Sequence, residues 1–214
     1  MNKTNSFFIN IWLVSLMIII LLMIIVGGLT RLTESGLSMV DWRLFMGTIP
    51  PLSQADWLKV FEDYKQYPEY QIKNINMTLS EFKYIFWWEY GHRVLGRLIG
   101  IIFIIPFVYF AYKKYFSKAE LYSYSFLLFL GGSQGVIGWW MVKSGLDINP
   151  YVSHLRLAVH LIIAQIILSF IAYLFIKRID VGVYKNNFSS HKSIFIFFNI
   201  IIFFTVIYGA FMAG

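Results

Sequence analysis

Residues 87–112, WWEYGHRVLGRLIGIIFIIPFVYFAY, decide the fold class. From Leu98 onward the stretch is almost wholly apolar, and it ends at Lys113 and Lys114. A helix needs roughly 20 apolar residues to cross the hydrocarbon core of a bilayer, which is about 30 Å thick. The stretch therefore predicts a membrane-spanning helix that carries a glutamate, a histidine and two arginines at its mouth.

The whole chain has the composition of a membrane protein. Its 214 residues are 58% hydrophobic, 20% aromatic and 14% charged, with a mean hydropathy of +0.66, which no ordinary soluble domain reaches. Apolar runs long enough to span a bilayer lie near 8–29, 93–112, 121–142, 157–176 and 193–213. We therefore expect an all-α polytopic membrane bundle of five transmembrane helices, with a partly helical loop between the first two.

The basic residues predict the orientation of the bundle. They gather beside the predicted spans, at Lys113, Lys114, Lys118, Lys177, Arg178, Lys185 and Lys192. Short loops rich in Lys and Arg remain on the cytoplasmic side of a membrane. These loops and the N-terminus are therefore predicted to lie inside, and the long loop 30–81 outside. The net charge of +7 is explained in this way, and no basic patch interleaved with aromatics suggests nucleic acid.

Two further features limit the chemistry. The first apolar run is too long for a signal-peptide core and has no small-x-small cleavage site, so we expect a retained helix. The chain has no cysteine, so the outer loop has no disulfide and any redox chemistry needs a cofactor.

The outer loop contains helix signals of its own. Ser53 and Asp56 predict the start of a short amphipathic helix, ADWLKVFEDYKQY. Thr78 and Glu81 form a T-x-x-E capping box, which predicts that a helix starts at about residue 79. No helix breaker follows before Pro106, so we expect one helix over 79–112. The pairs Trp87–Trp88 and Trp139–Trp140 are expected at the outer interface, as an aromatic belt.

Two of the four histidines have matched positions. His92 lies about 21 residues before Lys113, and His160 about 17 residues before Lys177, which correspond to roughly 31 Å and 26 Å of helix. Both are therefore predicted near the outer edge of the bilayer, on helices that run in the same direction. Two imidazoles that face each other across a bundle can be the axial ligands of a haem iron.

Charged residues accompany both histidines. Arg93 and Arg97 follow His92, and Arg156 precedes His160 by one turn, so guanidinium groups are available for haem propionates. Arg93 and Arg97 share a face about 100° away from His92, so we expect one to reach the haem and the other to pair elsewhere. Glu89 lies one turn before His92 on the same face, where it could exchange a proton or stabilise positive charge.

Plainer alternatives exist for each of these residues. The arginines could extend to the interface, the histidines could be interfacial polar residues, and Glu89 could simply hydrate a helix turn. The glycines at 131, 132, 135 and 138 are favoured as helix-packing positions, with close approach to a flat cofactor as the alternative.

Five stretches together resemble the haem A synthase family, of the long-loop mitochondrial and alphaproteobacterial type. They are GGLTRLTESGLSMVDW (27–42), GTIPPLS (47–53), FWWEYGHRVLGRLIG (86–100), GGSQGVIGWWMVKSGL (131–146) and VSHLRLAVHL (152–161). The resemblance covers essentially the whole chain, in order, and is far more specific than any one motif.

The resemblance implies an enzyme that oxidises a porphyrin methyl group of haem O, through a hydroxymethyl stage, to the formyl group of haem A. Haem A serves cytochrome oxidase. His92 and His160 match the histidine pair that holds the substrate haem iron, and Glu89 matches the family's catalytic glutamate. The implied partners are the lipid bilayer, haem O synthase and an electron donor. The implied location is a bacterial or mitochondrial inner membrane, with the N-terminus on the cytoplasmic or matrix side.

Members of this family have eight helices in two similar halves, and the second half holds a haem b. Residues 1–178 match the N-terminal half, with its outer loop at 30–81. Residues 179–214 match a linker and the first helix of a second half, whose histidine pair and haem b are not in this sequence. We therefore expect either a missing C-terminal half or a homo-oligomer.

Two rival hypotheses compete with an enzyme. A non-catalytic membrane haem protein that transfers electrons would need the two histidines but not Glu89. A structural membrane subunit would need none of them. An absorption spectrum of the purified protein tests the second rival, and replacement of Glu89 tests the first.

Overall fold

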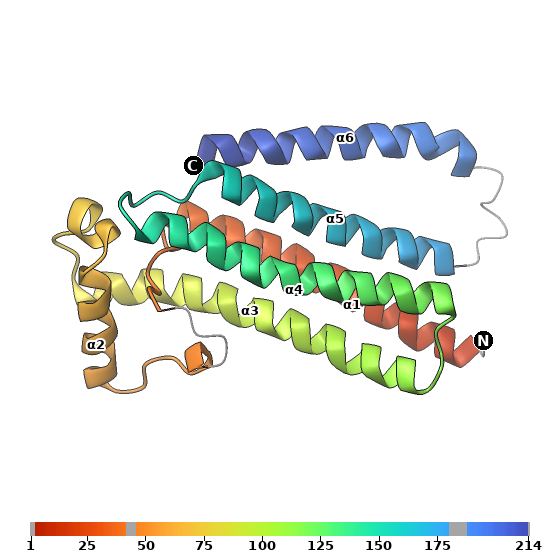
Figure 1. Ribbon diagram of the computed structural model, residues 1–214, viewed down its shortest axis with the longest axis horizontal. Helices are drawn as coiled ribbons and strands as arrows, with labels where there is room; N and C mark the ends of the chain where they lie inside the picture. Colours follow the sequence, from red (N-terminus) through yellow and green to blue (C-terminus); the bar gives the residue numbers. More distant parts are fainter. Residues whose placement is uncertain (1–2, 42–45, 180–187, 214) are drawn as a thin grey trace.

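The computed structural model describes residues 3–41, 46–179 and 188–213. Within these ranges the regular structure is entirely helical (Figure 1). The long helices are α1 (Lys3–Leu32), α3 (Leu79–Tyr112), α4 (Lys118–Leu146), α5 (His154–Arg178) and α6 (Phe188–Ala213), and the outer loop holds η1 (Met46–Thr48), α2 (Gln54–Lys65) and η2 (Glu69–Lys73). The predicted all-α membrane bundle is therefore confirmed.

Four helices form the bundle proper. α1 packs against α3 and α5, and α4 packs against the same two helices, so α3 and α5 lie diagonally across the bundle. α6 runs beside α5 (Figure 1). Among the described residues, α1, α3, α4 and α5 are long and apolar enough to cross a membrane, so the protein is an integral membrane protein. In α6 the apolar stretch Ile196–Met212 is shorter, and the fifth span stays a prediction.

The inner half of the bundle is filled by large side chains. Trp12 lies at its centre, where its indole packs edge-on against Phe103, Phe110 and Tyr124. The indole Nε1 also donates a 2.9 Å hydrogen bond to the carbonyl of Ile102, which joins α1 to α3. Within a bilayer, close packing of these rings and the interhelical hydrogen bond stabilise the helix contacts, and the paired indole N–H is not left unsatisfied. This half is therefore the rigid base of the bundle.

Helix α3 begins and ends where the sequence predicts. The Thr78 and Glu81 side chains form the reciprocal capping box, in which Glu81 accepts a 2.7 Å hydrogen bond from the Thr78 amide. The helix passes through Pro106 and ends at Tyr112, so it is one element of 34 residues. Its first turns extend beyond the bundle, where they support the outer loop.

The outer loop folds into a small module on these first turns. α2 starts at the predicted Ser53–Asp56 capping box and lies across the outer end of α3 (Figure 1). Its buried face packs on one face of α3, and this second core comprises Trp57, Phe61, Tyr64, Phe82, Ile85 and Phe86. The opposite face of α2 is polar, as the amphipathic pattern predicts.

A buried carboxyl group lies inside this outer module. Glu69 is 3% exposed, and its Oε2 accepts a 2.9 Å hydrogen bond from the Tyr64 hydroxyl. Asn74 donates a 2.8 Å hydrogen bond to the same hydroxyl oxygen. Burial raises the pKa of Glu69 from 4.5 to about 7, and the Tyr64 hydrogen bond opposes part of that increase.

The outer module is therefore expected to lose stability as the pH rises. Between pH 4.5 and about 7 the folded module binds more protons at Glu69 than the unfolded module does. The free energy of unfolding therefore falls across this window, by at most about 3 kcal/mol, and is flat above it. Hydrogen exchange of the α2 amides measured against pH should show this loss.

The matched pair of variants for this prediction is Glu69→Gln and Glu62→Gln. Glu69→Gln keeps an acceptor for Tyr64 and should remove the pH dependence. Glu62 is exposed on α2 and forms an ion pair with Lys65, so its replacement should leave the dependence intact. Equal dependence in both variants would contradict the assignment to Glu69.

The predicted orientation can be tested with single cysteines, because the chain has none of its own. Gln66 is exposed in the outer module, and Lys113 is exposed at the inner end of α3. In intact cells, a membrane-impermeant maleimide should label Gln66→Cys and not Lys113→Cys, and permeabilisation should expose both. Labelling of Lys113→Cys alone would reverse the orientation.

Candidate functional site

The two histidines with matched depth lie on the diagonal helices of the bundle. His92 is on α3 and His160 is on α5. Their imidazoles are close enough to interact electrostatically across the bundle. Both lie beyond the outer end of the large-residue core, which reaches Ile20, Phe103 and Ile167 in this direction. The structure therefore brings the two predicted ligands toward the same space, between the rigid base and the outer module.

Each histidine lies against a glycine of a neighbouring helix. A β-carbon added at Gly27 of α1 would lie 3.1 Å from Nε2 of His92, which is closer than side chains normally pack. A β-carbon added at Gly138 of α4 would lie 3.3 Å from Cε1 of His160. Glycine at these two positions therefore gives each imidazole room that any larger residue would fill.

The other α4 glycines do not fit the favoured packing role. Among the described atoms, a β-carbon added at Gly131, Gly132 or Gly135 would meet nothing within 4 Å. Close backbone approach to another helix is therefore not what these three positions provide in this structure. All three are exposed, and Gly138 is the α4 glycine that lies against a candidate ligand.

His160 also has an incomplete set of hydrogen bonds. Gln134 of α4 donates a 3.0 Å hydrogen bond from Nε2 to the backbone carbonyl of His160. Within the described part of the chain, the buried Nδ1 of His160 and the buried Oε1 of Gln134 have no hydrogen-bond partner. Buried polar atoms without partners are rare in folded proteins, and a bound group or water is a common explanation. The donor set, the glycine cradles and these atoms together fit a haem with two imidazole ligands.

Glu89 is held in a buried network one turn outward from His92. The residue is 3% exposed. Its Oε2 accepts 2.7 Å hydrogen bonds from the Ser38 hydroxyl and from the Met39 amide. Its Oε1 pairs with Arg93 at 2.5 Å. Both carboxylate oxygens are therefore occupied by donors.

Arg93 takes part in the same network. Its Nη2 donates a 2.8 Å hydrogen bond to the carbonyl of Met39, and its Nη1 lies 3.4 Å from the carbonyl of Asp41. The Glu89–Arg93 pair therefore fastens α3 to residues 33–41, the strap that follows α1. Of the two arginines beside His92, Arg93 is the one that pairs elsewhere.

The other two predicted arginines, Arg97 and Arg156, make different contacts. Arg97 lies deeper on α3, where its Nη2 is 3.3 Å from the position of a β-carbon at Gly47. Arg156 donates a 2.7 Å hydrogen bond to the carbonyl of Trp140, and its guanidinium lies 4.6 Å from the Trp140 ring centre. Arg156 therefore joins the outer ends of α4 and α5. Arg93 and Arg97 lie one turn apart on α3 and interact electrostatically, whereas Arg156 lies on α5.

Sequence reasoning missed several residues of this site. Ser38 and the Met39 amide contact Glu89, Gly27 contacts His92, and Gln134 contacts His160. The only available signal was that all four fall inside the stretches that resemble haem A synthase. A side chain that contacts a main-chain group has no spacing rule in the sequence.

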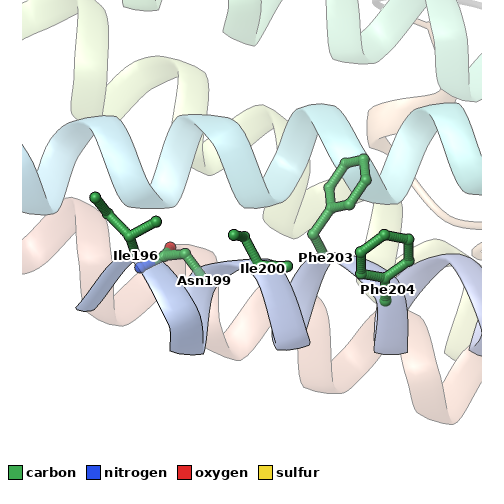
Figure 2. A pocket seen from close by; sticks show the side chains of 5 residues that line it. All are labelled: Ile196, Asn199, Ile200, Phe203 and Phe204. Atoms are coloured by element: carbon green, nitrogen blue, oxygen red, sulfur yellow. The ribbon is translucent and has the colours of Figure 1, made fainter. Parts of the chain in front are cut away.

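A surface groove lies elsewhere, on α6. Figure 2 shows the side chains that line it, Ile196, Asn199, Ile200, Phe203 and Phe204. They are apolar except for Asn199, and none of the candidate site residues is among them. The groove is therefore separate from the histidine site.

Comparison with known proteins identifies relatives of this chain. A heme A synthase of Nitrosospira multiformis is 44% identical over 209 residues, which are 96% of this chain and 59% of that protein. One from Flavobacterium johnsoniae is 43% identical over 100% of this chain and 63% of its own length. One from Bradyrhizobium diazoefficiens is 52% identical over 76% of this chain and 45% of its own length.

This chain thus spans about half to two thirds of the length of these curated relatives. No solved structure gives a significant match. The family model COX15-CtaA, described as cytochrome oxidase assembly protein, matches residues 10–214. The chain therefore belongs to the COX15-CtaA family of cytochrome oxidase assembly proteins.

Proposed function

We propose that this chain is the haem O-binding half of a haem A synthase, an oxidoreductase of cytochrome oxidase assembly. The observation that carries the proposal is the pair His92 and His160, which approach each other from diagonal helices, each against a glycine. The relatives that match 96% and 100% of the chain are both heme A synthases, which supports the same function.

His92 and His160 are proposed to bind the substrate iron through one ring nitrogen each. Bound haem supplies a porphyrin methyl group for oxidation. The glycines beside both imidazoles leave room for the two rings themselves, and the packed inner core sets how deep a bound porphyrin can lie. Arg97 and Arg156 are the arginines proposed for the propionates, and Arg93 is proposed to hold Glu89 to the strap instead.

Glu89 is proposed as the catalytic residue. Oxidation of a methyl group to a formyl group would remove four electrons and four protons in all and add one oxygen atom, which water can supply. The electrons would pass to the redox partner, and positive charge would develop at the reacting carbon before water adds. An ionised carboxylate fixed near that carbon would stabilise the charge and accept a proton. The Arg93 guanidinium and the two strap donors hold this carboxylate in one position.

The remaining partners are also proposals. A redox partner must exchange electrons with the substrate, and haem O synthase would supply that substrate. A C-terminal half or a second copy would complete the protein, and a haem b is expected there. We place it in a bacterial or mitochondrial inner membrane, with the N-terminus on the cytoplasmic or matrix side.

The proposed function can be tested with pigments extracted from membranes. Cells that make haem O but lack their own haem A synthase should accumulate haem A when they express the natural protein that includes this chain. Chromatography of the extracted haems distinguishes haem O, the hydroxymethyl intermediate and haem A. Haem O bound to the purified chain with no oxidised product would contradict the enzymatic assignment and favour a haem carrier.

A further inference from the structure

The buried carboxylate of Glu89 is fastened by a segment from outside its own helix. The strap, residues 33–41, follows α1 and crosses α3, and it presents Ser38 and the Met39 amide to one carboxylate oxygen. We propose that Ser38 is a positioning residue, whose hydroxyl fixes the Glu89 carboxylate for the oxidation of the substrate. This inference rests on the proposed function and concerns the same site.

The direction of the Ser38 hydrogen bond follows from the distances. The Ser38 hydroxyl has one proton and three acceptors within reach: Glu89 Oε2 at 2.7 Å, the Ser35 carbonyl at 3.2 Å and the Ile85 carbonyl at 3.4 Å. The carboxylate is both the nearest acceptor and the charged one, so it receives the proton. Ser38 is 2% exposed, so water does not compete for this bond.

The network leaves the carboxylate very little freedom. Oε1 is held by Arg93, while Oε2 is held by the Met39 amide and by Ser38. The amide and the guanidinium are both fixed to the strap backbone, and Ser38 supplies the third constraint. Without the hydroxyl, the carboxylate could rotate about its last bond or recruit a water molecule. A group that acts on developing charge loses efficiency when it must reorganise during the reaction.

The strap itself offers a matched control. Ser35 is 0% exposed in the same segment, and its hydroxyl pairs with that of Thr33 at 2.6 Å rather than with Glu89. Ser35→Ala and Ser38→Ala remove the same atom from equally buried positions. Ser38→Thr keeps the hydroxyl and serves as the conservative variant.

The experiment compares these three variants in membranes where the wild-type chain supports haem A formation. Ser38→Ala should lower kcat by roughly ten- to a hundredfold, as expected for one lost hydrogen bond to a charged group. KM and the haem content of the purified protein should stay within about twofold of wild type if the hydroxyl acts on the chemical step alone. Ser38→Thr should recover most of the activity, and Ser35→Ala should match wild type.

A second measurement does not depend on turnover. The infrared carboxylate bands of Glu89, identified by subtracting the spectrum of Glu89→Gln, should shift in Ser38→Ala and not in Ser35→Ala. Unchanged bands and unchanged kcat in Ser38→Ala would overturn the inference, and so would equal losses of folded protein in both alanine variants. If the wild-type chain made no haem A, the proposed function would fail, while the infrared comparison would still decide whether Ser38 holds Glu89.

Discussion

Purified His92→Ala and His160→Ala variants are expected to lose nearly all bound haem. Each would remove one of the two proposed iron ligands, which interact electrostatically across the bundle. Loss of an outer-shell partner alone typically weakens metal binding by about 10- to 100-fold, so loss of a ligand should exceed about 100-fold. The absorption spectrum of the protein in mild detergent, normalised to protein content, measures this retention.

His154→Ala is the matched control for this experiment. His154 is exposed at the start of α5, and its ring lies 5.3 Å from that of Phe211. It belongs to the same helix as His160 but not to the site, so its replacement should leave haem retention unchanged. The helical circular dichroism of all three variants should equal that of wild type. Full retention of haem by both His92→Ala and His160→Ala would refute the proposed ligation.

The helices could be predicted from the sequence because their signals are local. The capping boxes at Ser53 and Thr78 fixed the starts of α2 and α3, because each pairs a hydroxyl with a carboxylate three residues later. Pro106 did not end α3, since membrane helices tolerate proline when neighbouring helices satisfy the freed carbonyl. Helical rise alone also gave the matched depth of His92 and His160.

The partners of the site residues were harder to predict. The Glu89–Arg93 pair has the favourable i,i+4 order, with the acid first, so its signal was present in the sequence. The same two residues also have the spacing of a haem-facing pair, so the spacing alone does not distinguish the two arrangements. The strap contacts have no comparable signal in the sequence. They use the main-chain amide and carbonyl of Met39, and every residue except proline has both groups. The diagonal placement of α3 and α5 likewise needed the packed bundle.

Both carboxylate oxygens of Glu89 accept hydrogen bonds, and this changes how the residue can act in its proposed role. The spacing alone predicts that Glu89 can exchange a proton or stabilise positive charge on the His92 face of α3. The structure gives it three donors from two segments instead. Such a carboxylate is suited to electrostatic stabilisation from a fixed position, and less suited to a long movement that carries a proton away.

The Glu89→Gln variant is expected to bind haem O and to make at least about 100-fold less haem A, within the range for loss of a positioned acid or base. Glutamine has nearly the same shape, so it can keep the hydrogen bond from Ser38, but it has no charge to offer the reacting carbon or Arg93. The oxidation should therefore slow most where positive charge develops, and the hydroxymethyl compound should accumulate if the second oxidation depends more on Glu89. Chromatography of extracted haems measures all three species.

Loss of the charge also leaves Arg93 without its buried partner, which can cost about 3–5 kcal/mol, so folding must be measured beside activity. Glu69→Gln is the matched control: Glu69 and Glu89 are each 3% exposed, and Glu69 lies in the outer module instead of the bundle. If Glu89→Gln retains haem O with a native dichroism spectrum, its lost turnover reports on chemistry and not on folding. Wild-type conversion by a well-folded Glu89→Gln protein would show that Glu89 only fastens α3 to the strap.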